Sequence, residues 1–285
     1  MIALGDKDIS NLMLGNTQVT KVMLGEEQVY PFQVIHYESL VIKANADSTI
    51  GLARLSPNQT LEYSLDNEEW ATFNTSISIN LNCDDKMYIR GILNNNNSSA
   101  QFTQFKITGD VRLDGDMRYV WNYENPEAPL YNYCGFYMFK GCVGITSVSD
   151  KLLPPTTLAY TCYSSMFRDC IFLTKAPKLP ATTLENFCYE GMFEGCISLQ
   201  KAPELPATTL ADNCYQYIFY GCSKLNYIKC LAEDISSNNC TNGWVSGVAK
   251  EGTFVKSPNM NSWTINNSST YSGIPSGWTI IDADK

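Results

Sequence analysis

The stretch Cys188–Cys222 reads CYEGMFEGCISLQKAPELPATTLADNCYQYIFYGC and contains two blocks that each begin and end with a cysteine. Equivalent cysteines recur every 26 residues in two series, Cys162, Cys188, Cys214 and Cys240, and Cys170, Cys196 and Cys222. The pair Cys134 and Cys142 precedes its equivalents by 28 residues, which places a two-residue insertion within 147–155. This period predicts stacked units that bury their apolar faces against one another.

Each unit is expected to contain a short helix. In the copy TTLENFCYEGMF, Thr182 and Glu185 have the spacing of a capping box, and apolar side chains recur at every fourth position. The predicted helical stripe is Leu184, Cys188 and Met192. Gly195 is expected to end the helix, and a short strand or extended turn cut off by proline should follow.

The last copies of the repeat are degenerate. Cys240 aligns with Cys214 and Trp244 with Ile218, as expected of a capping unit. The remaining chain is predicted to complete the cap, with Trp263 and Trp278 covering the last open layer.

The cysteines are interpreted as a ladder of buried free thiols. There are 11 of them, an odd number, with no CxxC pair, and His36 is the only histidine. The usual zinc spacings are therefore absent, and no metal or other cofactor is expected. Disulfides or redox sensing stay open as alternatives, because cysteines on adjacent strands of neighbouring units would be close enough to bridge.

Residues 33–122 are predicted to form an antiparallel sandwich of immunoglobulin-like type. Short strand-like runs are separated by turn-rich segments: SLVIKA, TIGLARL, LEYSLDNEEWATF, SISINL, KMYIRGIL and QFTQFKITGDVRL. The asparagine-rich block 94–99 is interpreted as a solvated loop, with a ligand loop as the alternative.

Residues 1–31 contain a second repeat, of ten residues, in LGDKDI, LGNTQV and LGEEQV. The copies predict short β-ribbons that hold too little apolar surface to fold alone and therefore need partners. The residues assigned to this anchoring or oligomerising role are Leu4, Ile9, Leu14, Gly15, Val19, Leu24, Gly25 and Val29.

Resemblances of the repeat unit, of residues 1–31 and of one hairpin extend these predictions. The unit YxxMFxGCxxLxxAPxLPATTLAxxCY resembles the BspA-like leucine-rich repeats of gut bacteria and their bacteriophages, from near Tyr131 to the C-terminus. Residues 1–31 resemble the LGxxxVxxxxLG openings of gut phage virion proteins, fibres especially, and LEYSLDNEEW resembles a hairpin seen beside such repeats. The first resemblance implies adhesion or surface recognition. The second implies docking onto a phage particle and, by analogy with fibres, a homotrimer.

The expected fold is multidomain and mainly β with short helices. It comprises a β-ribbon anchor over 1–31, an immunoglobulin-like sandwich over 33–122, and a leucine-rich-repeat solenoid with a C-terminal cap over 123–285.

Composition argues against several classes of partner. The chain of 285 residues has a formal net charge of -9, which disfavours nucleic acid and anionic membrane surfaces. No apolar run is long enough to span a membrane, and the opening MIALGDKDIS resembles no export signal. Synthesis in the cytoplasm is therefore expected, and the resemblance to phage virion proteins implies incorporation into a virion.

Candidate site residues are few. Catalysis is not expected, because only His36 could serve a nucleophilic triad and no GxSxG, HExxH or GxxxxGKS motif is present. The acidic pairs Asp84 with Asp85 and Asp114 with Asp116 are interpreted as surface turn residues, with calcium binding or a carboxylate dyad as the alternatives. A row of tyrosines is the candidate ligand surface, unless those rings cover the helix layer instead: Tyr163, Tyr189, Tyr215 and Tyr217.

These features predict a non-enzymatic phage head or tail fibre that presents its repeats to a host surface or mucosal glycan. The alternatives are a purely structural capsid or tail decoration protein, and a bacterial surface adhesin.

Overall fold

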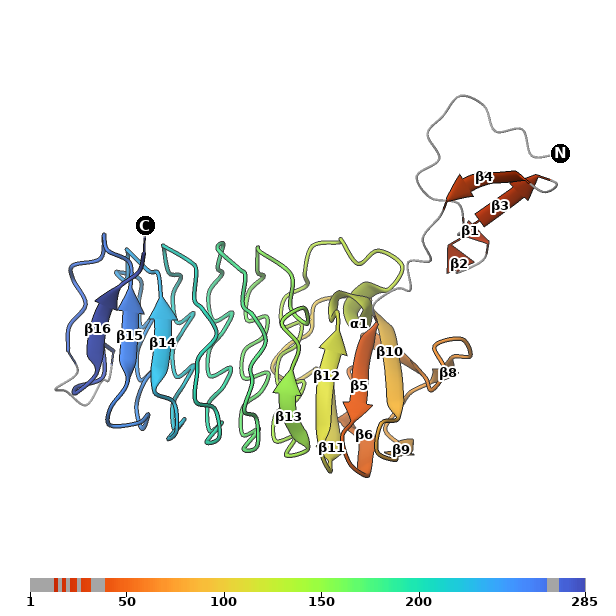
Figure 1. The fold of residues 1–285 in the computed structure, drawn as a ribbon, viewed down its shortest axis with the longest axis horizontal. Helices are drawn as coiled ribbons and strands as arrows, with labels where there is room; N and C mark the ends of the chain where they lie inside the picture. Colours follow the sequence, from red (N-terminus) through yellow and green to blue (C-terminus); the bar gives the residue numbers. More distant parts are fainter. Residues whose placement is uncertain are drawn as a thin grey trace. The chain divides into compact units, whose positions relative to one another are not determined.

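The computed structural model describes residues 13–14, 17–18, 21–24, 27–31, 39–265 and 272–284. The chain divides into two compact units, 1–38 and 39–285. The described chain is mainly β, as predicted, and its one α-helix is α1 (Arg118–Asn122) (Figure 1).

The N-terminal unit contains two antiparallel pairs of short strands. β1 (Met13–Leu14) pairs with β2 (Thr17–Gln18), and β3 (Lys21–Leu24) pairs with β4 (Glu27–Pro31). The predicted β-ribbons are therefore present in the described part. Leu14, Leu24 and Val29 lie in strands, whereas the other predicted anchor residues lie outside the described residues: Leu4, Ile9, Gly15, Val19 and Gly25.

Residues 39–115 form the strands that the sequence predicts. They are β5 (Leu40–Ala44), β6 (Ser48–Arg54), β7 (Gln59–Ser64), β8 (Ala71–Thr72), β9 (Ser78–Leu81), β10 (Lys86–Leu93), β11 (Gln104–Thr108) and β12 (Val111–Gly115). Alternate side chains are buried, most clearly along β10, because successive residues of a strand face opposite sides of the sheet. Together with β13 (Ile145–Val148), these strands form a six-stranded sheet of order β13-β12-β5-β10-β7-β8 and a three-stranded sheet of order β11-β6-β9.

The second half of the chain is joined to this sheet through β12. β12 pairs antiparallel with β5 on one side and parallel with β13 (Ile145–Val148) on the other. Residues 39–285 consequently share one continuous hydrophobic core.

From β13 onward, the chain forms stacked turns that we call coils (Figure 1). β14 (Tyr227–Cys230), β15 (Thr253–Lys256) and β16 (Thr279–Asp282) pair in parallel, with Tyr227 opposite Thr253 and Thr253 opposite Thr279. These partners are separated by the 26-residue period of the sequence. Isolated parallel bridges from Ser147 to Lys175 and from Lys201 to Tyr227 continue the same column.

The segment of each coil that was predicted to be helical contains consecutive turns instead, so the helix prediction and its caps are wrong. We call these segments the turn ribbons: 133–142, 161–170, 187–196, 213–222 and 239–248. In one of them, Cys188 N–H donates to Glu185 O three residues back (3.2 Å), whereas Tyr189 N–H donates to Cys214 O in the next coil (3.1 Å). This alternation continues along the ribbon, so half of its N–H groups hold neighbouring coils together. An α-helix would direct every N–H to a residue within itself.

The turn ribbon has a strict period of four residues. Cys188 and Tyr189 are buried, as are Met192 and Phe193, and the residues between the two pairs belong to the opposite face. In neighbouring coils the equivalent rings stack, with the Phe167 and Phe193 centroids 5.8 Å apart. The core is therefore built of columns of identical side chains that run along the stack.

The two C-terminal tryptophans pack against the last coils. Trp263 stacks on Trp244 of the last turn ribbon, with centroids 5.2 Å apart and 3° between the ring planes. Trp278 is buried and donates its Nε1–H to Ala249 O at 2.8 Å.

Candidate ligand-binding hollow

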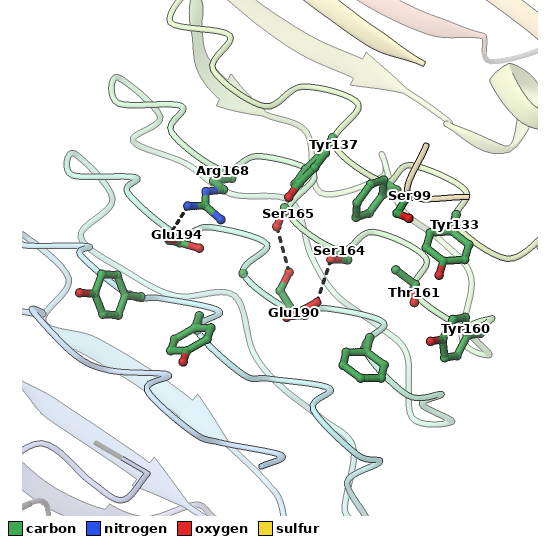
Figure 2. A pocket seen from close by; sticks show the side chains of 15 residues that line it. Ser99, Tyr133, Tyr137, Tyr160, Thr161, Ser164, Ser165, Arg168, Glu190 and Glu194 are labelled. Carbon is green, nitrogen blue, oxygen red and sulfur yellow. Dashed lines mark hydrogen bonds and ion pairs between the residues drawn. The ribbon is translucent and has the colours of Figure 1, made fainter. Parts of the chain in front are cut away.

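One face of the coils carries an open hollow of about 670 Å³, formed by the outward residues of four turn ribbons and by Ser99 of an earlier loop (Figure 2). Its walls combine aromatic rings with hydroxyl groups, one arginine and two glutamates. We call it the aromatic hollow.

A change in side-chain size between equivalent positions creates the aromatic hollow. One outward column of the turn ribbons contains Tyr137, Ser165, Gly191 and Tyr217 in successive coils. The two central members are small, and the two flanking members are tyrosines. A Cβ on Gly191 would lie 3.0 Å from Ser165 Oγ and 3.2 Å from Glu194 Oε2, so glycine keeps the centre clear.

The aromatic rings support one another around the hollow. Tyr160 packs edge-on against both Tyr133 and Phe187, with centroids 5.6 and 5.8 Å apart. On the opposite side, the rings of Tyr217 and Tyr220 meet at 90° with centroids 5.8 Å apart. Tyr217 and Tyr220 retain 37% and 45% of their accessible surface, so their rings are available to a ligand.

The backbone beneath these rings is unusual. Tyr133, Tyr137, Phe187 and Tyr217 have φ of 58°, 55°, 62° and 55°, in the left-handed region that non-glycine residues seldom adopt. Thr161 and Ser165 share this conformation and also line the hollow. The positive-φ ribbon positions outside the hollow hold residues that tolerate this conformation well, with the exception of the buried Tyr163 (φ 63°): Gly135, Gly141, Asp169, Gly195, Asn213, Gly221, Asn239, Gly243 and Gly247.

Three charged groups lie in the hollow. Arg168 pairs with Glu194, with Nη2 2.8 Å from Oε1. Ser164 Oγ donates to Glu190 Oε2 at 3.4 Å, a long hydrogen bond. Among residues 39–265 and 272–284, no Lys, Arg or His lies within salt-bridge distance of the Glu190 carboxylate. Burial raises the pKa of Glu190 above its ordinary value and the nearby Glu194 raises it further, whereas the hydrogen bond from Ser164 and the charge of Arg168 lower it in part.

The candidate tyrosine surface is largely wrong. Tyr163, Tyr189 and Tyr215 are at most 1% exposed, because each follows the inward cysteine and so belongs to the buried pair of its ribbon. Their rings stack with centroids 6.0 and 6.1 Å apart inside the core. The alternative, in which these rings cover a helix layer, is right about their burial only, because the segments are turn ribbons and not helices. Tyr217 is exposed and lines the aromatic hollow.

Other predicted features are placed as follows. Of the asparagine-rich loop, Asn97 is buried and accepts a hydrogen bond from Ser56 Oγ at 2.7 Å, whereas Ser99 reaches the aromatic hollow. Asp116 is buried rather than exposed, and its carboxylate accepts hydrogen bonds from Arg118 N, Nε and Nη2. Exposed Asp84 pairs with Lys43 at 3.1 Å.

The thiol prediction is confirmed for all cysteines but one. All 11 are free, and Cys83 alone is exposed. No described group of three or more His, Cys, Asp or Glu side chains could hold a metal ion. Within the same residues, no helix has the length and apolar character that crossing a membrane requires.

Sequence reasoning missed several rings of the aromatic hollow, namely Tyr133, Phe136, Tyr137 and Phe187. The sequence does contain a signal for them. In CYEGMFEGC, pairs of inward residues (CY, MF) alternate with pairs of outward residues (EG). Read with a period of four, it assigns Tyr137 and Tyr217 to the outward face.

Comparison with known families, with curated proteins and with solved structures gave no match.

Proposed function

We propose that this protein is a non-enzymatic recognition protein whose aromatic hollow binds a saccharide. The stacked coils are assigned to a leucine-rich-repeat solenoid of BspA-like type, and residues 39–115 to an immunoglobulin-like sandwich that carries it. By the resemblance of residues 1–31, the protein is a bacteriophage fibre that is attached to the virion through this segment and presents the hollow to a host surface or mucosal glycan.

The observation that carries the proposal is the backbone conformation of the aromatic residues. A non-glycine residue at positive φ costs on the order of 1 kcal/mol or more, and strain of this kind clusters at binding sites. Here Tyr133, Tyr137, Phe187 and Tyr217 all adopt it and all line the hollow. Folding alone would favour glycine or asparagine at these four positions, and their rings line the hollow, unlike the ring of Tyr163, which has a φ of 63° but is buried in the core.

The composition of the hollow suits a saccharide. Exposed tyrosine rings offer apolar faces on which a sugar ring can stack, at low cost in side-chain entropy. Thr161, Ser164 and Ser165 add hydroxyl groups that both donate and accept hydrogen bonds. Aromatic faces combined with a few convergent polar groups are typical of small-ligand sites.

A Tyr217→Asn variant tests the proposal, because asparagine already occupies other positive-φ sites of the turn ribbons, at Asn213 and Asn239. We expect this variant to fold with unchanged or higher stability and to lose binding to glycans or host cells. Phe172→Ala is the matched control, since Phe172 is a 55% exposed ring outside the hollow. Unchanged glycan and cell binding by Tyr217→Asn would reject the site. Binding of residues 39–285 only to other virion proteins would favour a decoration protein.

The attachment part of the proposal has its own test. Residues 39–285 form a compact unit without the N-terminal segment, so deletion of 1–38 should leave a folded protein. If the segment builds a homotrimer, the full chain should scatter light as a trimer and the deletion variant as a monomer. A trimer that survives the deletion would contradict this role.

A further inference from the structure

We propose that the saccharide bound in the aromatic hollow carries a free amino group, and that Glu190 is the residue that pairs with the resulting ammonium ion. This inference rests on the proposed function and names the chemical class of its ligand.

The first step is the position of Glu190 within the hollow. In its own outward column it follows Phe136 and Ser164 of the two preceding coils, and Figure 2 shows its carboxylate in the middle of the hollow between labelled residues of both walls. Tyr133 and Tyr160 lie on one side, and the Arg168–Glu194 pair lies on the other.

The second step is the difference between the two glutamates. Glu194 has its cation, because Arg168 Nη2 is 2.8 Å away. Within the described residues, the Glu190 carboxylate accepts only the long hydrogen bond from Ser164 Oγ at 3.4 Å, and no basic side chain lies within salt-bridge distance of it. A half-buried carboxylate without a cation loses hydration and gains little in return.

The third step is charge complementarity. With Arg168 neutralised by Glu194, the unbalanced charge in the hollow is the carboxylate of Glu190. A ligand cation would compensate for the lost hydration, and the surrounding aromatic faces favour a cation as well. A neutral sugar would use the rings and the hydroxyl groups and would leave Glu190 without a cation.

The aromatic rings and the carboxylate of Glu190 line the same hollow. The rings fit the flat face of a sugar, and the carboxylate fits a single ammonium group attached to that sugar. An amino sugar satisfies both requirements in one ligand, so we assign the hollow to saccharides with unacetylated amino groups.

The experiment compares two short oligosaccharides that differ only in this group, a chitosan oligomer and its fully N-acetylated counterpart. Binding to the full-length protein is measured by calorimetry near neutral pH. We expect wild type to prefer the amino oligomer by about tenfold or more, the size expected of a charge-assisted hydrogen bond. Glu190→Gln should abolish this preference and leave binding of the N-acetylated oligomer unchanged.

The matched control is Glu185→Gln, which removes an exposed carboxylate that does not line the hollow. It should retain the preference, and circular dichroism should show that both variants are folded. Equal binding of the two oligomers by wild type would overturn the amino-sugar assignment while the proposed function stands. Binding of neither oligomer, with tight binding of a lysine-rich peptide, would overturn the saccharide itself and with it the proposed function.

Discussion

Cys196 donates its Sγ–H to the carbonyl oxygen of Phe167 in the preceding coil, at 3.1 Å. The same hydrogen bond joins Cys170 to Phe139 and Cys222 to Phe193. Each thiol therefore fills a small apolar space and satisfies one carbonyl group of the neighbouring turn ribbon. A serine or a larger apolar residue could meet only one of these two requirements.

Native protein should be alkylated at one cysteine only. Burial raises the pKa of Cys142, Cys222 and Cys230 to about 12, so these thiols are both inaccessible and protonated at neutral pH. Exposed Cys83 is expected to react, and mass spectrometry should find a single adduct that is absent from Cys83→Ser. After denaturation all 11 cysteines should be modified. Rapid native modification of Cys196 would contradict a closed core.

Tyr215 should matter for its ring rather than for its hydroxyl group. The ring is fully buried and stacks on Tyr189, whereas the hydroxyl oxygen is buried and has no hydrogen-bond partner among the residues that the structure describes. Tyr215→Ala should lower the free energy of unfolding by about 3–5 kcal/mol. Tyr215→Phe should leave it unchanged or raise it, because an unsatisfied polar group is removed. Urea denaturation measures both, and a large loss in Tyr215→Phe would show that the hydroxyl group is satisfied.

Gly141 offers a test of the left-handed turn position. Its φ is 72°, and a Cβ there would meet nothing within 4 Å. Gly141→Ala should therefore cost about 1 kcal/mol of stability through backbone conformation alone. Gly141→Asn should cost less, because asparagine tolerates this region. Gly195→Ala should cost more than Gly141→Ala, since its Cβ would lie 2.5 Å from Asp169 Oδ1.

Glu190 should make stability depend on pH in a defined direction. Its pKa is raised in the folded state by burial and by Glu194, so ionisation at this site opposes folding. Protonated Glu190 makes its full contribution to stability at pH values below 4.5, which is its ordinary pKa. This contribution is lost as the pH rises through the raised pKa of the folded state. Glu190→Gln should therefore be more stable than wild type near pH 7. Urea denaturation measures the free energy of unfolding, with Glu185→Gln as the control. An advantage that persists unchanged at low pH would have another cause.

The strands of residues 39–115 could be predicted because alternation with a period of two is read directly from the sequence. The stacking of coils followed from the spacing of like cysteines, and this part of the fold agrees with expectation. The turn ribbons could not be assigned in the same way. A recurrence of apolar residues at every fourth position fits a helix over two turns, and the hydrogen bonds between coils that favour turns exist only in the assembled stack.

The wrong prediction of helices for the turn ribbons also misplaced the tyrosines of the candidate site. On a short helix Tyr189 would lie outside the predicted stripe of Leu184, Cys188 and Met192, whereas in the turn ribbon it joins Cys188 in the core. Tyr217 was assigned to the surface, where it lies, although its sequence neighbour Tyr215 is buried. The aromatic hollow depends on side-chain size across four coils, so no single repeat contains the pattern that defines it.

The column of Tyr137, Ser165, Gly191 and Tyr217 has a consequence for how such a protein can diversify. Because the coils have the same backbone conformation, a substitution at a single outward position can deepen, fill or shift the hollow without changing the packing of the core. Gain or loss of one whole coil would move the two tyrosine walls further apart or closer together by one step. Ligand preference can thus change through single substitutions in the outward columns, or through the gain or loss of one coil, while the core stays the same.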